Sequence, residues 1–151
     1  MSMFGGIDAS ASGLTAERLR MDVISNNIAN VNTTRTATGG PYRRQYVVFE
    51  PREADKQSFS SMLTGAMAST KLQAGDGVRA VGIETDSTQG NLIYDPGHPD
   101  ANANGYVEMP NVNIVTEMVD MITATRAYEA NTTAINSAKS MAMKALEIGR
   151  G

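Results

Sequence analysis

The sequence predicts a mainly α fold with a small β-rich insert, in which long N- and C-terminal helices pair with each other. Three observations support this class. Apolar residues recur every seven positions near the N-terminus, a longer alanine-rich helical pattern ends the chain, and short strand-like segments lie between them. Because one amphipathic helix cannot bury its own apolar stripe, the two stripes are expected to pair.

The N-terminal helix is predicted over residues 7–31. Asp8, Ser10 or Ser12 would cap its start, and an asparagine- and threonine-rich segment would unwind its end. Its stripe is a heptad pattern with two polar members, formed by Ile7, Leu14, Met21 and Ile28 together with Ser10, Glu17, Ile24 and Val31.

The C-terminal helix is predicted over residues 112–148, with Asn113 as its N-cap. At about 1.5 Å per residue it would exceed roughly 50 Å. Seven alanines give it high helix propensity and allow a neighbouring helix to approach closely. Its predicted stripe contains Ile114, Met118, Met121, Tyr128, Ile135, Ala142 and Leu146, with Thr125, Thr132 and Lys139 in the gaps.

The middle of the chain alternates short strands with loops. A threonine- and glycine-rich loop at 33–41 precedes strands predicted at 42–50, 77–85, 91–94 and 106–109. Residues 52–69 could form a mobile loop or a short helix. We therefore expect a helical core from residues 1–34 with 111–151, and a β-rich insert at 35–110.

Composition excludes several functions. The net charge is only −3 and no basic stripe is present, so nucleic acid is not an expected partner. The chain has no cysteine, which excludes thiolate metal sites and disulfides. No apolar stretch is long enough for a membrane span. The first thirteen residues lack the pattern of a cleaved signal peptide, so export would have to use another route.

Candidate chemical sites are weak. His98 is the only histidine and lies among prolines and glycine, which favours a turn. Residues 100–105 match the first half of a calcium loop, but Asn111 stands where a bidentate glutamate is needed. Arg126 and Glu129 have the spacing of a surface ion pair, and contact with a neighbouring subunit is the alternative for them. We predict no catalytic residue, cofactor or metal ion, and the protein is not expected to be an enzyme.

The two ends of the chain carry motifs that resemble those of flagellar rod and hook proteins. Residues 12–33 contain S-G-L-T-A followed by N-N-I-A-N-V-N-T, and residues 112–131 contain V-N-I-V-T-E-M-V-D-M-I followed by R-A-Y-E-A-N. The run Y-D-P-G-H-P-D-A-N-A-N-G-Y at 94–106 and Tyr42-Arg43-Arg44 resemble the proximal rod proteins in particular. Together these motifs cover most of the chain outside residues 52–74.

This resemblance implies a structural subunit of the proximal rod, the torque-transmitting drive shaft of the flagellar basal body. The terminal helices would pack as an antiparallel coiled coil that lines the inner tube, and the insert would lie outside it. The subunit would leave the cytoplasm through the flagellar type III export apparatus without a cleaved signal peptide. It would contact copies of itself, other rod subunits and the adaptor that joins the rod to the membrane ring, in the periplasm or cell-wall zone.

The residues expected at the assembly interface come from both terminal motifs. The asparagines at the end of the first helix are expected to bond between helix ends and neighbouring chains. The predicted interface comprises Leu14, Met21, Ile24, Asn27, Ile28, Asn30, Val31, Glu117, Met118, Met121, Arg126, Tyr128 and Ile135.

One alternative of another class stays open at this point. A soluble coiled-coil adaptor or export chaperone of the flagellar system would bind other helices without forming a tube. A wall-cutting hydrolase is a third and weaker alternative, because it would need paired carboxylates in a folded cleft.

Overall fold

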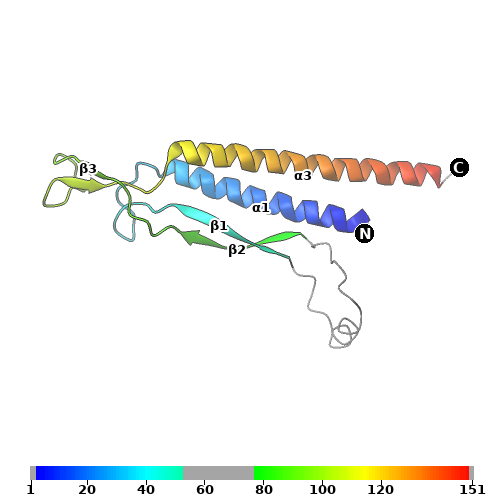
Figure 1. The fold of residues 1–151 in the computed structure, drawn as a ribbon, viewed down its shortest axis with the longest axis horizontal. Coiled ribbons are helices and arrows are strands. Elements are labelled where there is room, and N and C mark those ends of the chain that lie inside the picture. Colours follow the sequence, from blue (N-terminus) through cyan, green and yellow to red (C-terminus); the bar gives the residue numbers. More distant parts are fainter. Residues whose placement is uncertain (1–2, 53–76, 150–151) are drawn as a thin grey trace, which may run out of the picture.

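The computed structural model describes residues 3–52 and 77–149. The segment expected to be a mobile loop or a short helix, 52–69, lies almost wholly outside the described residues. Within the described residues, the fold has two long helices and two small antiparallel sheets (Figure 1). The mainly helical class with a β-rich insert is therefore confirmed in outline.

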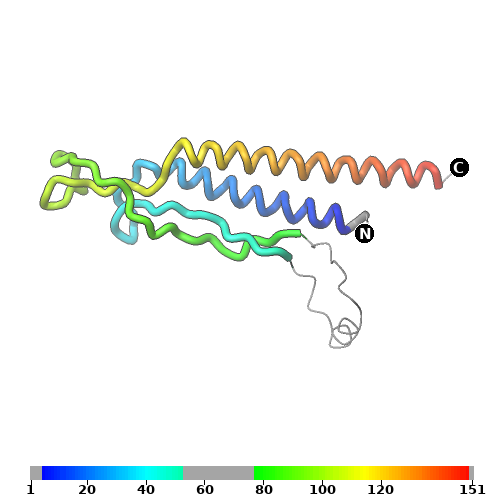
Figure 2. Tube along the Cα trace, in the orientation of Figure 1, coloured from blue at the N-terminus to red at the C-terminus, as the bar shows by residue number. Residues whose placement is uncertain are grey.

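The helices α1 (Met3–Ala29) and α3 (Ile114–Ile148) run antiparallel, side by side (Figures 1 and 2). Contacts along the pair define this direction. The amide of Asn27, near the end of α1, bonds to Glu117 in the first turn of α3. Gly13, nearer the start of α1, lies against Asn131, halfway along α3. The order of these contacts is reversed between the two helices, as an antiparallel pair requires.

The ends of the helices agree with the sequence in part. The Asn113 side chain accepts hydrogen bonds from the backbone N–H of Val115 and Thr116, which confirms it as the N-cap of α3. The predicted capping of α1 by Asp8, Ser10 or Ser12 is wrong, because the helix already begins at Met3. All three residues instead belong to turns of α1 that follow its start.

The buried face of α1 differs from the predicted stripe. Its most buried apolar residues are Ala16, Val23 and Ile24, whereas Leu14, Met21 and Ile28 are only half-buried. The difference arises because α1 lies between α3 and the first sheet, and packs against both (Figure 1). A helix covered on two sides buries a wider and rotated face than the single heptad seam assumed from sequence.

On α3 the side facing α1 carries buried and half-buried residues at alternating spacings of three and four. Met121, Tyr128, Ile135 and Ala142 were predicted in this row, and they are half-buried. The predicted members Ile114, Met118 and Leu146 are exposed in the chain, as are Thr125, Thr132 and Lys139. Their places on the inner face are taken by Glu117, Ala124, Asn131 and Ala138.

The first sheet pairs β1 (Gln45–Pro51) with β2 (Val78–Thr85). Its antiparallel register runs from Gln45 opposite Thr85 to Pro51 opposite Val78, with an irregularity between Val48 and Phe49. Both strands contact α1. Strand predictions at 42–50 and 77–85 are confirmed, although β1 begins three residues later than expected.

The second sheet is a hairpin of β3 (Leu92–Tyr94) and β4 (Tyr106–Glu108) that projects past the ends of the helices (Figure 1). The Tyr94 and Tyr106 rings pack edge to face, with centroids 5.2 Å apart. Gly105 has φ +77°, and an added Cβ would meet the Tyr94 ring at 2.9 Å. The sharp corner expected at this glycine is therefore present, and a close contact with the ring adds to the need for glycine.

The loop between β3 and β4 uses its own oxygens to hold its shape. The Asn102 side chain accepts hydrogen bonds from the backbone N–H groups of Asn104 and Tyr106. The Asp100 carboxylate accepts one from the Thr34 hydroxyl and lies 3.6 Å from Arg35. The oxygens that resemble calcium ligands in sequence thus bind groups of the protein itself. Across residues 3–52 and 77–149, no group of three potential ligand residues is positioned to hold a metal ion.

The apolar core of the described residues is small. It consists of Ala16, Val23 and Ile24 on α1, Ala124 on α3 and Val107 on β4. Neither of the two helices, over its described length, is apolar enough to cross a membrane.

Candidate functional site

A buried polar cluster joins α1, α3 and β1 where the three elements meet. At its centre the Asn27 side chain is 1% exposed. Its amide nitrogen donates to the Gln45 carbonyl at 2.8 Å and to Glu117 Oε2 at 3.0 Å. Its oxygen accepts from the Tyr42 hydroxyl and from the Gln45 backbone N–H, both at 3.0 Å.

The Asn27 amide is therefore completely satisfied. A carboxamide has two donor hydrogens and two acceptor lone pairs, and all four are used here, each by a different protein group. Glutamine is the only other side chain with a carboxamide, and it is one methylene longer. The position thus requires asparagine for a reason that heptad spacing alone does not show.

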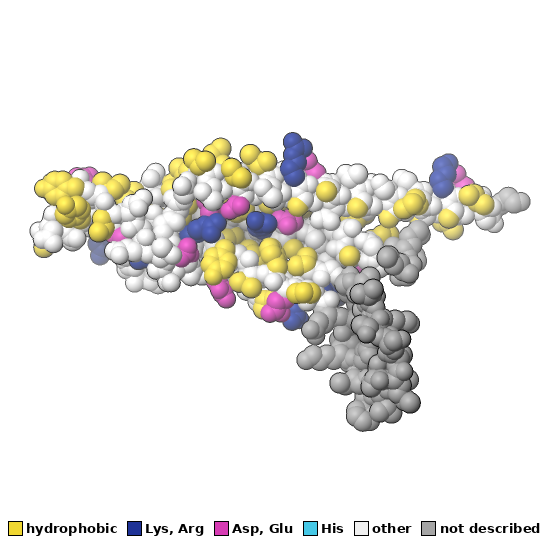
Figure 3. Space-filling view, in the orientation of Figure 1, with side chains coloured by type: hydrophobic (Ala, Val, Ile, Leu, Met, Phe, Trp, Pro, Cys, Tyr) yellow, Lys and Arg dark blue, Asp and Glu magenta, His cyan; other side chains and the backbone are white. Residues whose placement is uncertain are grey.

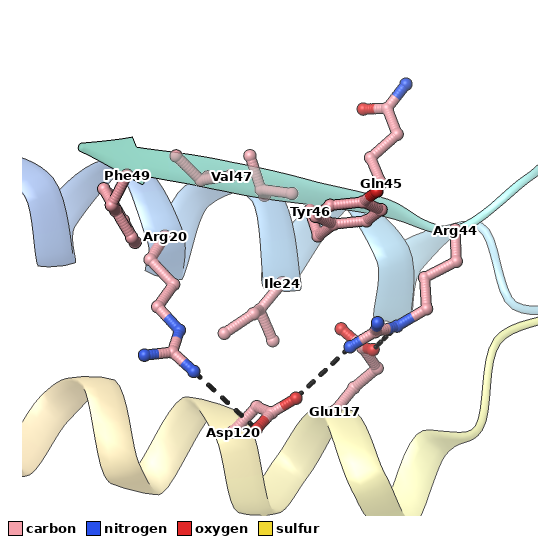
Figure 4. Close-up of a pocket in the computed structure, with 10 residues that line it drawn as sticks. Arg20, Ile24, Arg44, Gln45, Tyr46, Val47, Phe49, Glu117 and Asp120 are labelled. Atoms are coloured by element: carbon pink, nitrogen blue, oxygen red, sulfur yellow. Dashed lines mark hydrogen bonds and ion pairs between the residues drawn. The ribbon is translucent and has the colours of Figure 1, made fainter. Parts of the chain in front are cut away.

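Glu117 is the charged member of the cluster and is 0% exposed. Its other oxygen, Oε1, accepts a 2.6 Å hydrogen bond from Arg44 Nε. A second nitrogen of Arg44 lies 3.3 Å from Asp120, whose other oxygen lies 3.9 Å from Arg20 (Figure 4). Burying a carboxylate without a partner costs several kcal/mol, and Arg44 supplies that partner.

Charges alternate through this part of the molecule. Glu17 on α1, Arg20 on α1, Asp120 on α3, Arg44 before β1 and Glu117 on α3 follow one another at separations of 3.9, 3.9, 3.3 and 2.6 Å. The first two contacts are too long for hydrogen bonds, so the strength of the row is concentrated at Glu117. All of them except Glu17 line one side of an open groove of ≈ 330 Å³ (Figure 4). Most of the other lining residues are apolar, among them Ile24, Val47 and Phe49.

The segment before β1 is held by further hydrogen bonds. The Asn111 oxygen accepts from the Arg44 backbone N–H at 2.7 Å, and its amide donates to the Asp86 carbonyl at 3.3 Å. Burial, and then the negative charge of Glu117, raises the pKa of the Tyr42 hydroxyl above its usual value. Tyr42 therefore stays protonated and keeps donating to Asn27.

A second set of contacts explains Ser12 and Gly13 in the N-terminal motif. The Ser12 hydroxyl donates to the Ala9 carbonyl and accepts from the backbone N–H of Val78, which ties α1 to the start of β2. A Cβ on Gly13 would lie 2.8 Å from the Asn131 amide nitrogen. Gly13 thus permits α3 to approach closely at Asn131, the residue that ends the R-A-Y-E-A-N motif.

Comparison with known proteins matches both ends of the chain. Residues 7–35 match the family model described as "Flagella basal body rod protein". Residues 103–148 match the model described as "Flagellar basal body rod FlgEFG protein C-terminal". Among curated relatives, the "Flagellar basal-body rod protein FlgC" of Borreliella burgdorferi is 52% identical over the full length of both chains. The chain belongs to the flagellar basal body rod protein family.

Other relatives agree over nearly the whole chain. The proteins of the same printed name from Bacillus subtilis and Salmonella typhimurium are 49% and 36% identical, each over 99% of this chain and 100% of the relative. The predicted resemblance to the proximal rod protein is thereby confirmed. Membership of the rod family also confirms a structural role without enzymatic activity.

The buried cluster connects the two regions that define the rod family. Asn27 lies in the matched N-terminal region, whereas Asn111, Glu117 and Asp120 lie in the matched C-terminal region. Arg44 lies between the two. The rod-family ends therefore recognise each other within one chain, through Asn27 with Glu117 and Gly13 with Asn131.

The predicted interface residues divide into three groups within the rod-family fold. Ile24, Asn27 and Glu117 are buried within the chain, while Met118 and Arg126 are exposed. The remainder are half-buried, namely Leu14, Met21, Ile28, Asn30, Val31, Met121, Tyr128 and Ile135. Arg126 forms the expected surface pair with Glu129 at 3.3 Å.

Sequence reasoning did not identify two important members of the cluster, Arg44 and Asn111. Arg44 was noted only as part of a family motif, and Asn111 only as an unsuitable calcium ligand. A signal was nevertheless available for Arg44. Glu117 is among the residues predicted at the assembly interface, and an acidic residue that is buried in an interface requires a cationic partner.

Proposed function

We propose that this rod-family subunit polymerises through its terminal helices into a torque-transmitting shaft. The observation that carries the proposal is the imbalance between buried and exposed apolar residues. Among the described residues only five hydrophobic side chains are buried, whereas many large ones are exposed, including Val115, Val119 and Ile122 on α3. A stable monomer rarely leaves so much apolar surface uncovered in contiguous patches.

The helical core would be residues 1–34 with 111–151, and the insert at 35–110 would lie outside it. Spacings of three and four along the inner face of α3 support coiled-coil pairing with α1. In this arrangement the exposed Met118 and Arg126 contact neighbouring subunits. The buried Ile24, Asn27 and Glu117 act indirectly, by fixing the shape that each subunit presents.

The buried cluster gives the subunit a fixed relation between its elements, which a shaft under torque requires. The four hydrogen bonds of Asn27 reach α3, β1 and the segment before β1. Sliding α1 along α3 by one turn would break the hydrogen bond between Asn27 and Glu117 and leave Oε2 of that buried carboxylate without its donor. Buried polar groups fix register in other helix pairs in the same way.

The partners and location follow from the resemblance to rod proteins. We propose that the neighbours are copies of this chain, other rod subunits and the adaptor between rod and membrane ring. The subunit would reach the periplasm or cell-wall zone through the flagellar export apparatus, without a cleaved signal peptide. Relatives named as basal-body rod proteins support the basal body as the site of assembly.

Negative-stain electron microscopy of the concentrated protein tests polymerisation. We expect rods or short tubes whose number rises steeply with protein concentration, because each added subunit buries apolar faces of its neighbours. The competing function, a soluble adaptor or export chaperone, predicts monomers or small closed oligomers at every concentration. The proposal would be contradicted if the micrographs showed only monomers or small closed oligomers at every concentration.

A further inference from the structure

The hydrogen-bond ladder between β1 and β2 is open at the end that meets the start of α3. One residue beyond the last strand pair, Arg44 lies opposite Asp86, and its carbonyl accepts a hydrogen bond from the Asp86 backbone N–H at 2.7 Å. Facing residues of this kind in a regular antiparallel pair exchange two hydrogen bonds. The Arg44 N–H would thus return a bond to the Asp86 carbonyl, but it donates to the Asn111 side chain instead.

The Asn111 carboxamide takes the place of the missing bond. Its oxygen accepts from the Arg44 N–H at 2.7 Å, and its nitrogen donates to the Asp86 carbonyl at 3.3 Å. One side chain therefore satisfies both backbone groups and keeps them from bonding to each other. Without that side chain the two groups could close the ladder directly, because each is the regular partner of the other.

Asp86 is held from its other side, so closing the ladder would have to move Arg44. The Asp86 carboxylate accepts hydrogen bonds from the Thr88 hydroxyl at 2.6 Å and from the Thr88 backbone N–H at 2.9 Å. The Arg44 guanidinium lies 2.6 Å from the buried carboxylate of Glu117, toward which it extends in Figure 4. A shift of the Arg44 backbone toward β2 would draw the guanidinium away from this carboxylate.

We propose that Asn111 is a positioning residue, which holds the end of the ladder open so that Arg44 reaches Glu117. Arg44 is then held twice by the segment that leads into α3, through its backbone N–H at Asn111 and through its guanidinium at Glu117. Loss of this position would leave a buried carboxylate without its cation.

The role matters because charge contacts join the insert to the helix pair. On the face drawn in Figure 3, acidic and basic side chains gather in the band between α3 and the first sheet. The apolar core of the described residues is small, so these contacts carry much of the connection. The inference does not depend on polymerisation, since every contact in it lies within one chain.

A double-mutant cycle separates this role from the contribution of the Asn111 hydrogen bonds themselves. Asn111→Ala is made in the unaltered chain and in a chain that carries Arg44→Met with Glu117→Met, where no pair remains to be positioned. The backbone groups of residues 44 and 86 are the same in both. At one fixed protein concentration, we expect the thermal midpoint of the full-length chain to fall by roughly 6–10 °C in the first background and by about 3 °C or less in the second.

Two further variants control for the position and for the chemistry. Asn113→Ala removes another asparagine from the same segment, and loss of this N-cap should lower the midpoint by about 2–4 °C in both backgrounds. Asn111→Asp keeps an oxygen that accepts from the Arg44 N–H but loses the donor to the Asp86 carbonyl. In the unaltered chain it should lower the midpoint clearly less than Asn111→Ala does.

Equal losses for Asn111→Ala in the two backgrounds would overturn the proposal, because the side chain would then contribute only its own hydrogen bonds. An equal dependence on background for Asn113→Ala would overturn it as well. If Asn111→Ala does not fold in the unaltered chain, folding in the background without the pair still meets the expectation, and failure in both counts as an equal loss. None of these outcomes decides whether rods form, which microscopy tests separately.

Discussion

The Arg44→Met variant should lose most of its helical structure and fail to enter the rod. Arg44 supplies the cationic partner of Glu117, whose carboxylate is 0% exposed. Removing one member of a buried pair leaves an uncompensated charge and costs roughly 3–5 kcal/mol. Because the described apolar core is so small, we expect this loss to exceed the stability of the isolated helix pair. Circular dichroism of the purified variant and its recovery in isolated basal bodies measure the two effects.

Two further variants test whether the buried charge is the cause. Arg43→Met removes the neighbouring arginine, which lies 2.9 Å from Glu108. Both side chains of this pair are partly exposed, so the expected loss of folding stability is within about 1 kcal/mol. Arg44→Met combined with Glu117→Met removes both charges and should recover much of the helical signal. Equal damage by Arg43→Met, or no recovery in the double variant, would contradict the role assigned to the pair.

The Ala124→Leu variant should separate α1 from α3. Ala124 is 0% exposed and lies on the inner face of α3, so a larger side chain has no space without moving a helix. Overpacking of this kind costs about 1–3 kcal/mol. We expect a lower thermal midpoint and reduced incorporation into rods.

Ala130→Leu is the matched control for this steric effect. It makes the same substitution on the exposed side of the same helix, where alanine and leucine have similar helix propensity. Its expected effect on folding stability is within about 0.5 kcal/mol. If the two variants melted at the same temperature, close packing at Ala124 could not be what holds the helices together.

The sequence predicted which elements form more accurately than which faces they bury. Helix spacing, alternating strand residues and the Asn113 cap located the two helices and four strands of the described residues to within a few residues. The stripe on α1 was misplaced because β1 and β2 cover a second side of that helix, and local periodicity contains no information about a sheet formed elsewhere in the chain. For the same reason Ser12 was assigned to a cap, although it bonds to Val78 in another element.

The polar cluster within the chain was not predicted, although two of its members, Asn27 and Glu117, were expected at the assembly interface. Their contact spans 90 positions in the chain, and its completion depends on Arg44, Tyr42 and Asn111 from segments with no regular pattern. Such a site depends on tertiary geometry, which spacing along one element cannot specify. Glu117 shows that it needs a cationic partner only once the structure reveals that its carboxylate is buried.

The central claim is that the two helices complete their burial only in the assembled rod. Hydrogen exchange of the dilute chain and of the assembled form, read by mass spectrometry, tests it most directly. We expect weak protection of both helices in the dilute chain, weakest in residues 142–148, and strong protection of the same amides after assembly. Strong protection throughout α1 and α3 in the dilute chain, unchanged by assembly, would show that the monomer is already complete and would contradict the claim.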